Sequence, residues 1–205
     1  MKKTLALVFT LAFLLIFPFI GYADSPITST PFSDAYLDIG IVKKAKTDGV
    51  MSLEIAEYLS SPANPVDIKA AVINALSWQF EGKNNATLYS YYLALKYRRP
   101  LEGLDMDMLT GDEIFSLGYL TVMDDYFHPE KAVPLLERAK ERLRDSLTVS
   151  MILALAKAQA AMSSDWCEVW ELTEEVTRNE KLKQDLRWRA RKIILAYMVL
   201  YRDYC

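Results

Sequence analysis

The sequence predicts an exported protein that is almost wholly α-helical. Its first residues have the three parts of a secretory signal peptide. The chain has only 7 glycines among 205 residues, and runs rich in the strong helix formers Ala, Leu, Glu and Lys recur along it. Apolar residues recur at helical spacing, whereas the alternation typical of strands is rare. We expect stacked helical hairpins of about nine helices after the signal peptide, either an α-solenoid-like array or an irregular helical bundle.

The signal peptide is the first element. Two lysines follow Met1, and an uncharged apolar run, 4–20, comes next. Small residues, Gly21 and Ala23, stand at the two positions that a signal peptidase reads. We expect removal of residues 1–23 and export to the periplasm or the medium, and the short start is typical of bacteria. The alternative is an uncleaved membrane anchor, for which the run is slightly short.

The net charge of the chain limits the classes of partner that it is expected to bind. Without the first 23 residues the chain has 22 basic and 27 acidic residues, a net charge of −5. This overall charge disfavours nucleic acid and anionic lipid as partners. We therefore expect membrane contact only through an uncleaved signal segment, and a protein or peptide as the partner. The remaining chain is long enough for one compact domain with an ample core.

The first half of the mature chain predicts a leader and four helices. Residues 24–32 contain two prolines and several Ser and Thr residues, so we expect an extended, mobile leader. Helical periodicity then fills a first group, 33–99, in which turn signals such as Asp48-Gly49 and Ser61-Pro62 separate the helices. The expected helices are 33–46, 51–60, 65–80 and 86–98.

The second half predicts a loop and five helices. The irregular stretch 100–111 is long enough for a functional loop. Helical periodicity resumes over a second group, 112–205, and Thr110 with Glu113 predicts a capping box at its start. Short connections make neighbouring helices antiparallel. The expected helices are 112–126, 129–144, 147–162, 165–177 and 182–203.

Small residues in the second group suit close helix packing. Gly118, Ala132 and Ala139 let two helices approach, while Leu136 fills the gap between them. This spacing resembles a tetratricopeptide repeat, and the resemblance extends over Glu113 to Thr177. It is partial, because the family's usual aromatic residue and closing proline are replaced here. The resemblance implies stacked helical hairpins.

A second resemblance lies in the first group. The segment Leu53 to Leu76 places Ala71 and Ala75 where a HEAT-type helix pair has small residues. It resembles one such repeat. Both families mainly recognise other proteins, and neither resemblance brings catalytic residues with it. An irregular bundle whose hairpins converge on these patterns remains the alternative.

The helix expected over 86–98 is apolar on two neighbouring faces. One face follows the spacing of a core stripe and consists of Leu88, Tyr91, Tyr92 and Leu95. The other consists of Tyr89, Leu93 and Tyr97. We expect this second face to bind a partner, because an exposed tyrosine offers a rigid ring and a hydroxyl group. The alternative is a helix covered on both sides.

Residues suited to chemistry do not form a recognisable catalytic or metal-binding set. His128 is the single histidine, so a histidine-dependent triad or metal site has no second member. The acidic residues Asp105, Asp107, Asp112 and Glu113 suggest calcium, but their spacing is not that of an EF-hand. We expect no cofactor and no metal. A cell-envelope hydrolase that uses paired carboxylates is the alternative to a binding protein.

Two further features leave alternatives open. Glutamates 168, 171, 174 and 175 precede basic residues 187, 189, 191 and 192, and facing rows of opposite charge are expected to pair across a hairpin. Cys167 and Cys205 allow a disulfide, free thiols or pairing between chains. A tight turn near Lys181 would leave the two cysteines about 15 Å apart, which disfavours the bridge.

These observations lead to one functional expectation. We expect a non-enzymatic adaptor or scaffold that binds another protein in the periplasm or cell envelope. Besides the hydrolase, a carrier that holds an apolar ligand between helices is an alternative, because aromatic residues make up 12% of the chain.

Overall fold

The computed structural model describes residues 25–205, so the expected signal peptide lies outside the described residues. Nine α-helices and five 3-10 helices make up this range, and it contains no strand. The prediction of an all-α fold is confirmed. None of the helices within 25–205 is long and apolar enough to cross a bilayer.

The helices have the following bounds. The α-helices are α2 (Gly40–Asp48), α3 (Leu53–Ser60), α4 (Val66–Leu76), α5 (Asn85–Tyr97), α6 (Gly111–Asp124), α7 (Val133–Arg142), α8 (Leu147–Ala161), α9 (Trp166–Arg178) and α10 (Trp188–Met198). The 3-10 helices are η1 (Phe32–Tyr36), η2 (Leu101–Gly103), η3 (Met106–Met108), η4 (Pro129–Lys131) and η5 (Val199–Tyr204).

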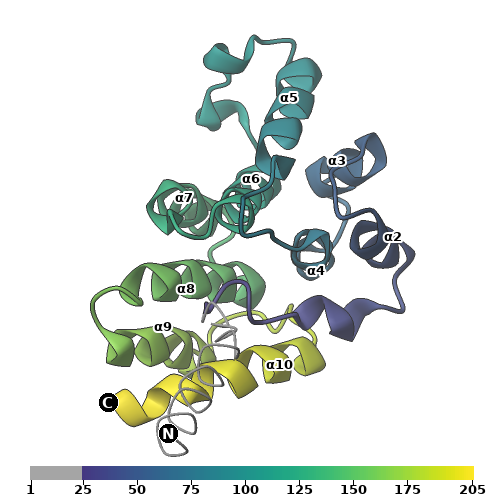
Figure 1. Cartoon of the computed structure of the whole chain (residues 1–205). Coiled ribbons are helices and arrows are strands. Elements are labelled where there is room, and N and C mark those ends of the chain that lie inside the picture. Colours follow the sequence, from purple (N-terminus) through teal and green to yellow (C-terminus); the bar gives the residue numbers. More distant parts are fainter. Residues whose placement is uncertain (1–24) are drawn as a thin grey trace, which may run out of the picture.

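Figure 1 shows how these helices are arranged around α6. Helices α8, α9 and α10 stack below α6 and α7, and α2, α3 and α4 lie beside them. Helix α5 lies at one end of the molecule, and α10 lies at the opposite end. The two helices therefore present surfaces that face away from each other.

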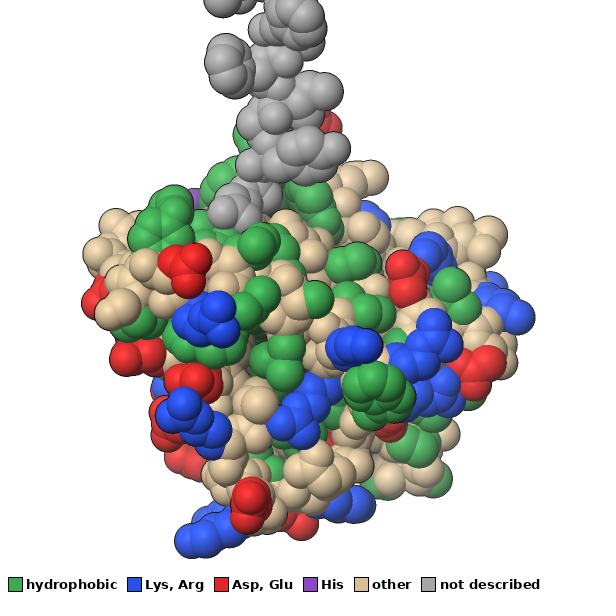
Figure 2. Space-filling model, turned by 90° about the horizontal axis from the view of Figure 1, so that it is seen from below, with side chains coloured by type: hydrophobic (Ala, Val, Ile, Leu, Met, Phe, Trp, Pro, Cys, Tyr) green, Lys and Arg blue, Asp and Glu red, His purple; other side chains and the backbone are tan. Residues whose placement is uncertain are grey.

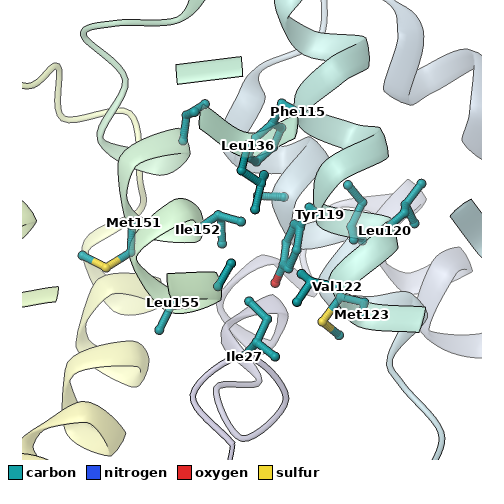
Figure 3. Packing of buried hydrophobic residues seen from close by; sticks show 14 of the residues in the cluster. Ile27, Phe115, Tyr119, Leu120, Val122, Met123, Leu136, Met151, Ile152 and Leu155 are labelled. Atoms are coloured by element: carbon teal, nitrogen blue, oxygen red, sulfur yellow. The ribbon is translucent and has the colours of Figure 1, made fainter. Parts of the chain in front are cut away.

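The core is centred on α6, which is buried on nearly all sides. Figure 3 shows Phe115 and Tyr119 of α6 facing Leu136 of α7 and Ile152 of α8. A helix that is apolar all round is suited to such a central place. Because one cluster of buried residues joins α4, α6 and α8, both groups of helices share a single core across the stretch 100–111.

The expected leader is instead a buried turn. Ser29 donates its backbone N–H to the carbonyl of Ser25 at 2.9 Å. The Ile27 side chain is fully buried and packs in the core close to Tyr119 (Figure 3). The prediction of an extended, mobile segment is wrong for residues 25–30, because the Ile27 side chain packs between helices that lie far away in the sequence.

Two hairpins of the second group pack as the small residues suggest. Helix α6 pairs with α7, and α8 pairs with α9. A Cβ atom at Gly118 would lie 3.0 Å from the side chains of Leu135 and Leu136, which shows how closely α7 approaches α6. Ala132 and Ala139 are fully buried. The first group differs, because α4 packs mainly against α2 and η1 and has few contacts with α3.

Helix boundaries differ from the prediction where tertiary contacts intervene. The helix expected over 65–80 ends at Leu76, since Ser77 adopts a left-handed φ of 63°. The helix expected over 33–46 is divided into η1 and α2. The capping box at the start of α6 is confirmed: Thr110 accepts the Glu113 N–H, and the Glu113 carboxylate accepts the Thr110 N–H at 2.8 Å.

The structure joins Cys167 and Cys205 in a disulfide, with their Cα atoms 4.8 Å apart. The expected separation of about 15 Å assumed a tight turn near Lys181. The connection after α9 is longer, because Lys183 pairs with the start of α8, and α10 begins only at Trp188. As a result η5 lies beside α9, and the C-terminal residue reaches the start of that helix.

Candidate functional site

Helix α5 is held at its start by side chains of other segments. Its Ala86 N–H donates to Oδ2 of Asp124 in α6 at 2.7 Å. Asn85 in turn accepts the Met51 N–H at 2.7 Å through its side-chain oxygen. At the other end, Arg98 adopts a left-handed φ of 53° and closes the helix. These contacts fix which face of α5 is turned to solvent.

The face that we expected to bind a partner is turned inward. Tyr89 and Leu93 are fully buried, and the Tyr89 hydroxyl shares a hydrogen bond of 3.0 Å with Ser60 in α3. Tyr97 is half-buried and donates to Glu113 at 2.7 Å. The assignment of Tyr89 and Leu93 to a partner surface is wrong, because no side chain this deeply buried can contact another molecule without unfolding.

Three of the four residues that we assigned to the core form the exposed face of α5, whereas Tyr92 is half-buried against the core. Leu88 is 40% exposed, Tyr91 53% and Leu95 79%. These three residues follow the spacing i, i+3 and i+7, so they form one continuous apolar stripe. We call Leu88, Tyr91 and Leu95 the α5 stripe. The two faces have similar compositions, and only the positions of α3 and α6 decide which of them is covered.

Basic residues border the C-terminal end of the α5 stripe. Lys96 is neutralised, since it donates to buried Glu113 at 2.6 Å. Arg98 and Arg99 are exposed and form no ion pair with any described residue. The stripe is therefore an apolar surface next to two positive charges that no residue within 25–205 pairs with.

The four acidic residues considered for calcium do not converge in the structure. Asp107 pairs with Arg138, and Asp105 accepts the backbone N–H of Asp107 at 2.9 Å. Asp112 pairs with Lys69 at 2.5 Å, and Glu113 lies in the capping box. Each carboxylate thus has a separate structural partner.

Two of these acids belong to a buried charged network where α4, α5 and α6 meet. Lys69 is fully buried, and burial lowers its pKa while the hydrogen bond to Asp112 opposes that shift. Burial alone would raise the pKa of Glu113, but hydrogen bonds from Lys96, Thr110 and Tyr97 hold it below its usual value. Desolvation by burial and, to a smaller extent, the hydrogen bond to Glu113 raise the pKa of Tyr97 to about 12. Every member is partnered, so the network holds helices together.

His128 also has an ordinary structural place. It precedes η4 and is exposed, and its Nδ1 lies 3.1 Å from Oε1 of Glu130.

The charged rows of α9 and α10 do not pair as expected. Among the described residues, Glu174 pairs with Arg178 of its own helix, and Arg187 pairs with Asp38.

A depression of about 450 Å³ lies between residues 79–84 and 124–128, and no local pattern predicts it. The aromatic rings of Phe80 and Phe127 meet there at 5.4 Å. Asp124 is buried beside it, with Oδ1 lacking a hydrogen-bond partner among the described residues. Burial raises the Asp124 pKa to about 6, against the opposing effects of the Ala86 N–H and Lys83.

The charged groups of this depression serve the fold. Asp124 accepts the Ala86 N–H at the start of α5. Lys83 donates to the carbonyls of Gly49 and Leu76 at 2.6 and 2.5 Å. Lys83 thus ties the ends of α2 and α4 together. We assign a structural role to both residues.

Asp124→Asn is expected to stabilise the protein at neutral pH, by at most about 3 kcal/mol. The folded state raises the Asp124 pKa from 3.8 to about 6, so it binds the proton more tightly than the unfolded chain does. The stability gained from this proton is present below about pH 4 and is lost as the pH rises through about 6. Asparagine stays neutral and escapes this loss. Urea unfolding between about pH 4 and 8 measures the difference.

Asp125→Asn is the matched control for this experiment. Asp125 is the next residue and forms an exposed ion pair with Lys131 at 2.9 Å, so its loss is expected to cost less than about 1 kcal/mol. A stability difference for Asp124→Asn that stays constant across this pH range would show that burial does not perturb the carboxyl group.

Comparison of the chain with protein-family models, with curated proteins and with solved structures gives no match.

Proposed function

We propose that the protein is an exported, non-enzymatic adaptor or scaffold that binds a protein partner through the α5 stripe. The observation that carries the proposal is the exposure of Leu88, Tyr91 and Leu95 on one face of a helix whose opposite face is well packed. Contiguous exposed apolar side chains at helical spacing are typical of binding surfaces. Export itself rests on the sequence of residues 1–23.

The chemistry around the stripe suggests the kind of partner. An apolar row bordered by unpaired Arg98 and Arg99 suits an amphipathic segment that has acidic residues beside its apolar face. Tyr91 is the candidate anchor, because its ring adds a large contact area and its hydroxyl group can form a hydrogen bond. Charge complementarity at the arginines would set the orientation of the bound segment.

The stacked hairpins support a scaffold role. Helices α6 with α7 and α8 with α9 pack as successive pairs. Such arrays present helix faces to partners on a rigid frame. Three of the acidic residues considered for calcium, Asp107, Asp112 and Glu113, are each engaged in structural ion pairs, which supports a structural role for them.

The proposal is tested with the double variant Tyr91→Ala/Leu95→Ala. We expect it to lose, by about tenfold or more, the binding of a partner that wild-type protein captures in stoichiometric amount from the native cell envelope. Its melting temperature is expected to stay within a few degrees of wild type, because both side chains are largely exposed.

Leu200→Ala serves as the control, since Leu200 is 64% exposed and lies on η5, far from α5 (Figure 1). We expect this variant to capture the partner as wild type does. Equal capture by wild type, the double variant and the control would refute the α5 stripe as the binding surface.

A further inference from the structure

We infer that the outer face of α10 is a docking surface for an anionic lipid membrane, and that this role is independent of the α5 stripe. Helix α10 packs its inner face on the protein through Ala190, Ile194 and Met198, which are fully buried. Its outer face is also apolar and forms a shallow depression of about 490 Å³. The depression is lined by Trp188, Arg191, Lys192, Leu195, Ala196 and Val199. We call these six residues the α10 surface.

The apolar members of the α10 surface lie in one line along the helix. Trp188, Leu195 and Val199 are separated by seven and four residues, which places them on the same side of α10. Trp188 is 69% exposed. Leu195 and Val199 are half-buried and Ala196 is exposed, so this second apolar line reaches solvent chiefly through Trp188 and Ala196.

Positive charge flanks this line on both sides. Arg189 and Arg191 border it, and Lys192 lies within it with Nζ 4.9 Å from the centre of the Trp188 ring. None of these three cations forms an ion pair with a described residue, and Arg191 donates only to the Gln184 side chain and the Thr177 carbonyl. No carboxylate lines the depression. The charges are therefore free to attract anions.

Local charge here opposes the charge of the whole chain. Residues 187–203 contain five basic residues and one acidic residue, a net charge of +4. The chain without residues 1–23 has a net charge of −5, so the rest of it carries −9. Figure 2, which views the molecule from below, shows basic side chains gathered beside apolar ones on this face. Arg187 pairs with Asp38, so the positive charge that no described carboxylate pairs with along α10 belongs to Arg189, Arg191 and Lys192.

The shape and the aromatic residues favour a membrane over an acidic protein. Helix α10 lies at the lower edge of the molecule (Figure 1). Trp188 stands at one end, and exposed Tyr204 and Trp166, whose rings meet at 4.7 Å, stand at the other. Trp and Tyr prefer the interface between lipid and water, and basic helices with one apolar face lie in its plane. Lysine and arginine add attraction to anionic headgroups.

The test is co-sedimentation of the protein with vesicles of phosphatidylcholine alone or with about one third phosphatidylglycerol. The protein is used as the cell exports it, so that wild type and variants share the same N terminus. We expect wild type to bind the anionic vesicles more tightly and to lose this preference in high salt. Arg189→Glu/Lys192→Glu is expected to weaken binding to the anionic vesicles by about tenfold or more, with little change on neutral vesicles.

Arg98→Glu/Arg99→Glu is the matched control, because it changes the net charge equally but lies at the end of α5. We expect it to bind anionic vesicles as wild type does. Trp188→Phe should keep the binding and lose part of the fluorescence quenching caused by brominated lipid chains, which places Trp188 at the membrane. Equal weakening by both charge reversals would overturn the inference. A salt-sensitive dimer that forms without vesicles and is lost in Arg189→Glu/Lys192→Glu would also overturn it, in favour of a second copy of the chain.

Discussion

Asp112→Ala is expected to lower the free energy of unfolding by about 3 to 5 kcal/mol, because it leaves the Lys69 ammonium buried without the carboxylate that it hydrogen-bonds. Lys69 is fully buried in α4, and its Nζ lies 2.5 Å from Oδ1 of Asp112 at the start of α6. The Lys69 side chain is fully buried in the wild-type protein, so the Asp112 carboxylate takes the place of water at its ammonium group. Chemical unfolding in urea measures the loss.

The reverse change is expected to cost less. Lys69→Met leaves Asp112 without its partner, but the Asp112 side chain is 17% exposed. It also lies in the first turn of α6, where the helix dipole favours negative charge. Both effects stabilise the unpaired carboxylate. A double variant, Lys69→Met/Asp112→Leu, should be more stable than Asp112→Ala alone, because it removes both charges from the interior.

Asp107→Ala provides the control for the buried pair. Asp107 also pairs with a cation, Arg138, but its side chain is 72% exposed. Loss of an exposed pair is expected to cost less than about 1 kcal/mol. If Asp112→Ala cost no more than Asp107→Ala, the Lys69 ammonium would have to be hydrated, and the network between α4 and α6 would be looser than the structure shows.

Tyr89→Ala is expected to lower the free energy of unfolding by about 3 to 5 kcal/mol. The ring is fully buried between α3 and α6, and its removal leaves a cavity. The change also takes away the hydroxyl group that pairs with Ser60 at 3.0 Å. The loss is measured by thermal and urea unfolding, while far-ultraviolet dichroism checks that the variant still folds.

Tyr91→Ala is the matched comparison, since it removes the same side chain two residues further along α5. Tyr91 is 53% exposed, so we expect a change within about 1 kcal/mol. Tyr97→Ala should fall between the two, because Tyr97 is half-buried and donates to Glu113. If Tyr91→Ala cost as much as Tyr89→Ala, α5 would be covered on both faces, and the α5 stripe could not serve as a binding surface.

Local sequence patterns were sufficient to predict the class of fold and several of its local features. The scarcity of glycine and the helical spacing of apolar residues predicted an all-α chain. Thr110 and Glu113 predicted the capping box, which depends on residues three positions apart. The small residue Gly118 predicted a close approach between two helices that follow each other in the chain. Each of these features depends on near neighbours in sequence.

Only the tertiary structure decided which of two equivalent faces of a helix is buried. The two faces of α5 have similar spacing and composition, and Ser60 and Glu113 from other helices bind Tyr89 and Tyr97 and so select one of them. The same holds for Ile27, whose turn is buried by helices far along the chain, and for Cys205, which the long connection before α10 brings to Cys167. Helical periodicity records that a face is apolar, but burial depends on distant segments whose positions no local pattern encodes.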